Sequence, residues 1–402
     1  MVKKRTYLIL AFVVFLVVPG LADTLGDAAS KGKVSVDLRY RFELVDQDGF
    51  EKNAEASTLR LRLGYTTKEF YGFSIHVDME TIQVVGRERY NSTDNGKTEY
   101  PVVADPPDSE LNRAYLDFTG VDETLFRLGR QRIKMDNDRF IGNVGWRQNE
   151  QTFDAFTVSN TSLVNTKLTF HYIRNVNRIF GEHHSKLGNT RLNGYVFHGK
   201  YTFSLGNAIA YVHFFDYRHE PEKSHQNYGL RFDGGYDLSQ STKLLYQAEF
   251  ATQHDYKDGA VKINANYLLL ELGCDWNKLK IQAGYEKLGG DGIYGFSTPF
   301  ATLHKFNGWA DKFITTPDNG LVDKYIHLGY PVDIMGRSLV LKASFHSFNS
   351  DSGSIKYGSE IDLLVQMDIW EDFNVLVKYA GYNAKDYATN THKFWIALRY
   401  WF

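Results

Sequence analysis

Five cations lie close together between Leu128 and Ala155, and their chemistry suits the binding of carboxylates. The segment reads LGRQRIKMDNDRFIGNVGWRQNEQTFDA and contains Arg130, Arg132, Lys134, Arg139 and Arg147. A guanidinium group is a planar fork that forms two parallel hydrogen bonds with one carboxylate. Gly142 and Gly145 would let the backbone turn sharply between the arginines. Each arginine could instead pair with an acid of the protein itself and only brace the structure.

Other candidate chemistry in the sequence is weaker. His183 and His184 are adjacent, but no third metal ligand stands at a convincing spacing. The run Asp136-Asn137-Asp138 lacks the glycine and the distal glutamate of a calcium loop. No nucleophile-elbow, zinc-protease or phosphate-loop motif is present. We therefore predict neither a metal nor a cofactor, and we predict that the protein is not an enzyme.

The residues from Lys393 to Phe402 indicate the kind of element that would position these side chains. In KFWIALRYWF every second residue counted back from Phe402 is apolar or aromatic, and the opposite parity includes two cations. A period of two places the two sets on opposite faces of a strand. One face suits hydrocarbon, and the other suits water or polar side chains. A terminal Phe with an aromatic residue two positions earlier resembles the closing strand of bacterial outer-membrane barrels, where the last strand pairs with the first.

The same alternation recurs along the chain and predicts about eighteen strands between residues 33 and 402. Within 34–44, for example, Arg39 and Arg41 are among the polar residues that alternate with apolar ones. Arg60 and Arg62 have the same place in the alternation within 58–65. Short links alternate with long ones at 85–109, 135–149, 175–192 and 289–324. Outer-membrane barrels distribute periplasmic turns and extracellular loops in this way. The fold class is therefore all-β: a transmembrane antiparallel β-barrel of about 18 strands, with the polar loop 85–109 exposed to solvent or mobile.

The N-terminus and the composition are compatible with this assignment. Residues 1–22 combine a basic head, an apolar run from Leu8 to Val18 and small residues before Asp23, which predicts a signal peptide cleaved after Ala22. An uncleaved anchor is the alternative. The barrel domain would then span 23–402. The 28 Phe, 26 Tyr and 6 Trp suit aromatic girdles at the two membrane interfaces. A formal net charge of −2 gives no nucleic-acid signal.

Two separated segments resemble the alginate-export family of outer-membrane porins. The first comprises Leu128-Gly129-Arg130-Gln131, Arg139-Phe140-Ile141-Gly142, Trp146-Arg147-Gln148 and Thr152-Phe153-Asp154. The second comprises Thr298-Pro299-Phe300 and the run HKFNGWADKF from His304 to Phe313, followed by Gly320-Leu321 and Asp323. The resemblance implies an 18-stranded pore in the bacterial outer membrane, with an arginine-lined constriction and loops folded inward. The candidate constriction residues are Arg130, Arg132, Arg139, Arg147, Asp154, Lys305, Asn307, Asp311 and Lys312.

The function expected from these observations is passage of anionic or sugar-like solutes, for which an acidic polysaccharide such as alginate is one option. The excess of lumen-facing cations over acids is small, and a polyuronate conduit would need a larger one. A general or phosphate-type anion porin is the alternative, and an enzyme or adhesin anchored by the barrel is a third reading. The expected partners are outer-membrane lipid and an anionic or carbohydrate solute, with a periplasmic export partner as a further option and no nucleic acid.

Overall fold

The computed structural model describes residues 22–334 and 336–402, and most of them belong to one antiparallel sheet of 18 strands. The expected signal peptide lies outside the described residues except for its last residue, Ala22, which begins helix α1 (Ala22–Ser30). The strands are β1 (Lys33–Gln47), β2 (Ala54–Thr66), β3 (Phe73–Val84), β4 (Asp108–Val121), β5 (Thr124–Gln131), β6 (Thr152–Asn160), β7 (Thr166–Asn177), β8 (Asn189–Phe203), β9 (Gly206–Tyr217), β10 (His225–Ser239), β11 (Thr242–Asp255), β12 (Asn264–Trp276), β13 (Leu279–Leu288), β14 (Leu321–Ile334), β15 (Arg337–Asn349), β16 (Lys356–Trp370), β17 (Phe373–Ala384) and β18 (Thr391–Trp401). Two short 3-10 helices complete the described elements, η1 (Pro221–Lys223) and η2 (Leu303–Lys305).

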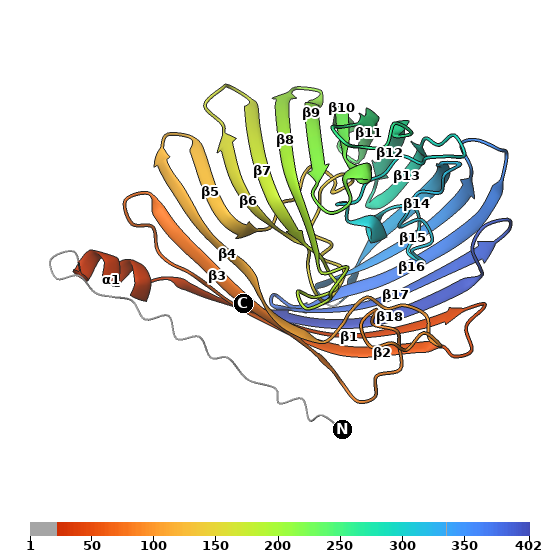
Figure 1. The fold of residues 1–402 in the computed structure, drawn as a ribbon, viewed down its shortest axis with the longest axis horizontal. Coiled ribbons are helices and arrows are strands. Elements are labelled where there is room, and N and C mark those ends of the chain that lie inside the picture. The colour runs from red at the N-terminus through yellow and green to blue at the C-terminus, as the bar shows by residue number, and fades with distance from the viewer. Residues whose placement is uncertain (1–21, 335) are drawn as a thin grey trace.

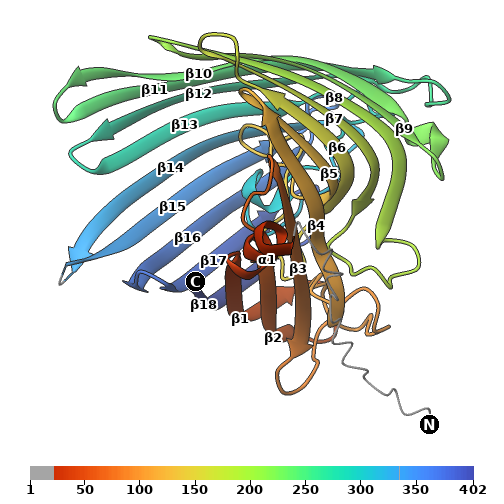
Figure 2. The ribbon, with the colours of Figure 1, turned by 90° about the vertical axis from the view of Figure 1, so that its left-hand side faces the viewer.

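The sheet closes on itself, because β1 pairs with β2 on one side and with β18 on the other (Figures 1 and 2). Phe402 continues this seam: its backbone N–H donates to Val36 O at 3.0 Å, and its carbonyl accepts from Val36 N at 3.0 Å. Closure leaves no unpaired strand edge in the sheet. The predicted fold class and the closing role of the C-terminal strand are therefore confirmed.

Alternation along each strand separates an outer face from a lumenal one. On β18 the side chains of Lys393 and Trp395 are buried in the lumen, whereas Phe402, on the opposite parity, is 61% exposed. The outer face of the whole barrel carries large exposed apolar side chains such as Leu63, Leu230 and Leu272. Within residues 22–334 and 336–402, no helix is long and apolar enough to cross a membrane.

Short hairpin turns join the strands at one end of the barrel, and long loops join them at the other. The two-residue turn Asn277-Lys278 illustrates the first kind: both residues have positive φ (45° and 75°), as a type I′ turn requires. The long loops comprise residues 85–107, 132–151, 178–188 and 289–320. The 132–151 and 289–320 loops lie inside the ring of strands (Figure 1), where Ile141 and Phe300 form an isolated parallel bridge.

The 85–107 loop differs from the expectation of an exposed or mobile segment. Tyr90, Val103 and Asp105 are completely buried. The Asp105 carboxylate forms an ion pair with Arg41 and accepts a hydrogen bond of 2.8 Å from the backbone N–H of Gln148. The loop is therefore ordered by the lumenal charges, which its own polar, proline-bearing composition did not reveal.

Candidate functional site

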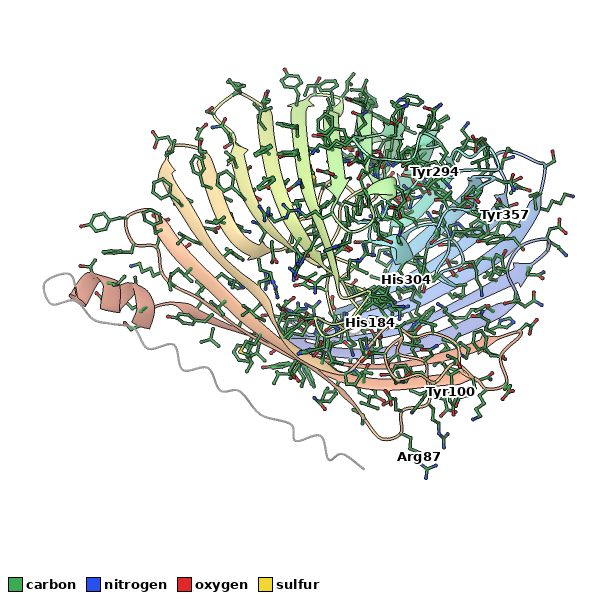
Figure 3. The ribbon with its side chains drawn as sticks, in the orientation of Figure 1. Arg87, Tyr100, His184, Tyr294, His304 and Tyr357 are labelled. Atoms are coloured by element: carbon green, nitrogen blue, oxygen red, sulfur yellow. The ribbon has the colours of Figure 1, made fainter. Side chains whose placement is uncertain are left out.

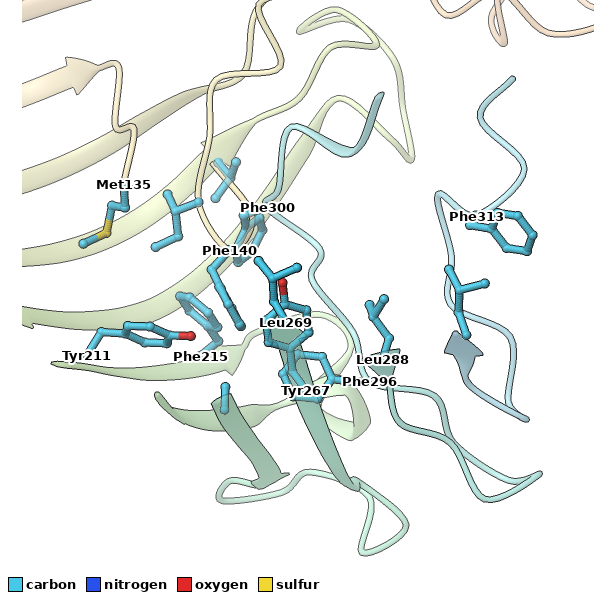
Figure 4. Close-up of a cluster of buried hydrophobic side chains, with 14 of the residues drawn as sticks. Met135, Phe140, Tyr211, Phe215, Tyr267, Leu269, Leu288, Phe296, Phe300 and Phe313 are labelled. Carbon is cyan, nitrogen blue, oxygen red and sulfur yellow. The ribbon is translucent and has the colours of Figure 1, made fainter. Parts of the chain in front are cut away.

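An apolar contact fixes the two inward-folded loops to one side of the wall. Phe140 of the 132–151 loop packs against Tyr211 and Tyr267, at ring-centroid distances of 5.1 and 5.5 Å. Phe300 of the 289–320 loop packs against Phe215 at 5.1 Å (Figure 4). Gly142 lies where the two loops meet, and an added Cβ there would stand 2.2 Å from Thr302 Oγ1. The glycine thus permits the close approach that its position in the sequence suggested.

Charged groups hold the same loops to the opposite side of the wall, at β1 and β18. Arg39 Nη1 donates to Gly145 O at 2.9 Å and its Nε to Gln148 Oε1 at 2.9 Å. Arg41 donates to Trp146 O. Arg39 stands directly opposite Arg60 on β2 and Arg399 on β18, so three like charges lie in a row across the strands. Like charges in such a row repel one another, and the hydrogen bonds of Arg39 to the loop offset this repulsion.

Arg147 and Asp311 join the two loops to each other and to the wall. Arg147 Nη1 donates to Glu43 of β1 at 3.0 Å, and its Nη2 donates to Asp311 Oδ2 at 3.2 Å. Lys393 of β18 donates to the same Asp311 oxygen at 2.7 Å. Burial alone would raise the pKa of Asp311, but its hydrogen bond with His304 and the charges of Lys393 and Arg147 hold it well below its usual range.

Arg139 and Asn307 form a second contact between the loops, against β13. Arg139 is 1% exposed, its Nε lies 2.8 Å from Glu286 Oε1, and its Nη2 donates to Asn307 Oδ1 at 3.0 Å. The amide nitrogen of Asn307 donates in turn to Glu286 at 2.6 Å. Burial alone would lower the pKa of Arg139, and Glu286 raises it instead. Arg139 therefore stays charged in the interior.

The remaining loop cations differ in their partners. Arg132 donates twice to Glu150, at 2.8 and 2.7 Å. Lys305 is half exposed and donates to Asn137 O at 2.8 Å, with Asp138 3.8 Å away. Lys312 forms no ion pair in the part of the chain that the structure describes, and it lies 6.0 Å from the Tyr382 ring.

The structure places Arg130 and Asp154 apart from the other predicted residues. They stand opposite each other on β5 and β6, where Arg130 Nε donates to Asp154 Oδ1 at 2.9 Å. Both lie on the strand face opposite to the buried Gln131 and Phe153. Arg130 ends up on β5 and Asp154 on β6, whereas Arg139 and Arg147 lie in the loop between these two strands. Closeness in the sequence therefore does not bring the four residues to one place.

Several side chains of the site were not singled out in the sequence. Glu150 accepts hydrogen bonds from Arg132, Asn112 and Asn143, and Arg62 lies 3.5 Å away. Burial would raise its pKa, but Arg62 and Arg132 lower it. Glu150 lies three residues after Arg147, so an acid close to the arginines was a usable signal. Lys393 was visible as a lumen-facing cation, but nothing in the sequence connects it to Asp311.

Lys378 of β17 occupies a box of three tryptophan rings. Its Nζ lies 3.6 Å from the Trp309 ring centroid, 4.2 Å from that of Trp146 and 5.3 Å from that of Trp395. It also lies 2.7 Å from His304 Nε2, and it forms no ion pair among the described residues. Figure 3 shows His304 in the middle of the barrel interior. Indole faces are the strongest aromatic partners of a cation, so this box suits the ammonium form of Lys378.

A chamber of about 440 Å³ lies below the loops, toward the end of the barrel with the short turns. Its wall combines aromatic side chains, cations, acids and histidines, among them Phe306, Trp309, Tyr325, Lys280, Lys342, Glu271, His327 and His346. Pockets of roughly 300–1,000 Å³ commonly bind small molecules in proteins. Among the described residues, no group of three or more metal-ligating side chains is placed to hold an ion.

Comparison with known proteins gives one family match and many structural ones. A sequence model described as alginate export matches residues 31–291. The crystal structure of Pseudomonas aeruginosa OccK9 (OpdG) has a TM-score of 0.71 at 11% identity, covering 93% of this chain and 99% of that one. Acinetobacter baumannii OccAB4 has a TM-score of 0.71 at 12% identity, covering 92% and 98%. Pseudomonas aeruginosa OpdK, crystallised with vanillate, has a TM-score of 0.68 at 12% identity, covering 92% and 98%. No curated protein matches the sequence.

Proposed function

Because the chain belongs to the alginate export family of bacterial outer-membrane β-barrels, we propose that its lumen passes anionic or sugar-like solutes across the outer membrane. The observation that carries the proposal is the chamber below the loops. It places aromatic faces next to cations and hydrogen-bonding groups in one small-molecule-sized space. Aromatic faces can stack on sugar rings, and cations offset the hydration that a carboxylate loses in a narrow pore. A uronate, which has both features, is the solute class that we propose.

The size of the chamber favours small solutes over a polymer in this arrangement of the loops. A polysaccharide would have to pass the 132–151 and 289–320 loops, which contact opposite sides of the wall.

Most loop arginines are paired with acids, so the anion preference would come from cations without a carboxylate partner among the described residues, such as Arg39, Lys312 and Lys378. The OpdK crystal structure contains vanillate, which shares small size and a carboxylate with a uronate, although its ring is aromatic. A periplasmic export partner would meet the barrel at the short turns, toward which the chamber extends.

Planar-bilayer recording of the purified protein tests the proposal. We expect ion conductance with an anion preference, and we expect glucuronate to reduce the current more than glucose or phosphate does. Trp309→Ala should weaken the effect of glucuronate, whereas Trp370→Ala, a matched change at an outward-facing ring that is 61% exposed, should not. Equal effects of glucuronate and phosphate would favour a general or phosphate-type anion porin. No conductance would favour an enzyme or adhesin anchored by the barrel.

The anion preference should also depend on pH through Lys312. Burial, and next the positive charge of Lys393, lower the pKa of Lys312 to about 8. Lys312 is therefore charged at neutral pH and loses its charge as the pH rises through that value. Reversal potentials measured from about pH 7 to about pH 9 should show a falling anion preference. A lysine with the ordinary pKa of about 10.4 would keep its charge over this range. Lys312→Arg should keep its charge and abolish this change. An identical pH profile in both proteins would contradict the assignment.

A further inference from the structure

The carboxylate of Asp311 lies in a site built from three separate parts of the chain. Lys393 of β18 donates to Oδ2 at 2.7 Å, and Arg147 of the 132–151 loop donates to the same oxygen at 3.2 Å. His304 of η2 lies 2.7 Å from Oδ1 through its Nδ1. The side chain is only 6% exposed. These groups therefore surround one carboxylate with a guanidinium, an ammonium and an imidazole, the set of donors that a solute carboxylate would need.

The hydrogen bonds of His304 define its state in this site. Its Nε2 lies 2.7 Å from the ammonium group of Lys378, which can only donate. The imidazole is therefore neutral, with its proton on Nδ1, and it donates that proton to Asp311. Burial lowers the pKa of His304 to about 3, which agrees with a neutral ring. Four basic side chains thus converge here, and Asp311 is the acid that contacts three of them.

The backbone that delivers Asp311 has an unusual conformation. Asn307, Gly308 and Asp311 all have positive φ, of 55°, 82° and 62°. Such values are uncommon for residues other than glycine and carry strain. Between them, the backbone N–H groups of Trp309 and Ala310 donate to Asp362 and Glu360 of β16. Polar contacts, rather than strand pairing, hold this segment against the wall.

The segment that bears Asp311 also borders the chamber. Trp309 lines the chamber, and Lys378 lies over the Trp309 ring while it contacts His304. A row of contacts therefore joins the chamber to the groups that hold Asp311. The chamber is where the proposed function places the solute.

We infer that Arg147, Lys393 and His304 form a binding site for a carboxylate of the solute, and that Asp311 occupies this site as a tethered substitute. The inference rests on the proposed function and adds a site and a mode of entry to it. A solute carboxylate that displaces Asp311 takes over the same donors, so no cation is left buried without a partner. Displacement also removes the ion pair of Asp311 with Lys393 of β18, so the segment 307–311 keeps only its contacts with β13 and β16. The solute thereby opens its own way past the loop.

Asp311→Asn tests the site, because the amide keeps the size of the side chain and removes its charge. With the competing carboxylate gone, glucuronate should reduce the bilayer current of the variant at an about tenfold lower concentration than in wild type, the effect of one freed charge-assisted hydrogen bond. Glucose should act equally on both proteins. Asp216→Asn is the matched control, since Asp216 is paired with Lys257 at 2.6 Å on the outward parity of β9. This control should respond to glucuronate as wild type does.

Tryptophan fluorescence of the wild-type protein provides a second test that needs no variant at Asp311. The Trp146 ring stacks on His304 with a centroid distance of 4.7 Å and an interplanar angle of 6°. Release of Asp311 shifts this histidine, so glucuronate should change the emission, glucose should not, and Trp146→Phe should lose the change.

A conducting Asp311→Asn protein with wild-type sensitivity to glucuronate would refute the site and leave the proposed function standing. If that variant does not insert, unchanged wild-type emission at saturating glucuronate refutes the site. A wild-type protein without conductance would refute the proposed function itself.

Discussion

Replacing Arg139 by methionine should lower the free energy of unfolding by about 3–5 kcal/mol, because it leaves a buried carboxylate without its cation. Glu286 is 3% exposed and Asn307 is 4% exposed, so water cannot replace the lost guanidinium without local opening. The methionine fills similar space, so the loss is electrostatic rather than a cavity. The 132–151 and 289–320 loops should separate from β13, and the open-channel conductance should rise.

Denaturant unfolding in detergent, followed by the gel shift between folded and heated protein, measures the stability change. Arg130→Met is the matched control, because Arg130 is also paired with an acid, but on a strand and at a partly exposed position. Its loss should cost about 1 kcal/mol or less. Equal shifts for the two variants would contradict the role assigned to Arg139 in holding the loops.

Leu61→Arg should lower the stability of the inserted barrel by about 2–4 kcal/mol, the cost of a cation near the middle of the bilayer on the outer face. Leu61 lies near the middle of β2, on the parity of the 50%-exposed Leu63. Val34→Arg makes the same chemical change near the start of β1 and should cost about 0–1 kcal/mol, since that end lies close to the interface. Comparing the denaturant midpoints of the two variants in lipid vesicles would measure the difference. Equal midpoints would show that the strand centre does not lie at mid-bilayer.

The lumenal neighbour of Leu61 shows where reasoning from the sequence alone is insufficient. The alternation predicts correctly that Arg60 faces the lumen, where an apolar replacement should be cheap. In the structure Arg60 is 2% exposed and lies 2.6 Å from Asp37. Arg60→Leu therefore removes one of the two cations that pair with the partly buried Asp37, while Arg399 remains, so its cost should exceed that of a change at an exposed lumenal position. Parity predicts the face of a strand, but not whether loops fill the space in front of it.

The fold was predictable because a period of two is a local signal that repeats in each strand. The strand positions, the closing role of Phe402 and the alternation of short turns with long loops all follow from it. The site was predictable only in part, because its contacts join distant residues. Arg147 pairs with Glu43, 104 residues away, and Arg139 donates to Asn307, 168 residues away. Two loops and the wall must meet before these partners exist, and no spacing within one segment encodes such a meeting.

The closure of β1 onto β18 also determines when the barrel can fold. Asp37 accepts a hydrogen bond from Arg399, 362 residues further along the chain. Until that far segment is available, β1 keeps an edge of unpaired N–H and C=O groups, which hydrocarbon cannot accommodate. Insertion therefore cannot advance stepwise from the N-terminal strands with each intermediate complete. The chain must therefore reach the outer membrane with its apolar outward faces still uncovered by lipid.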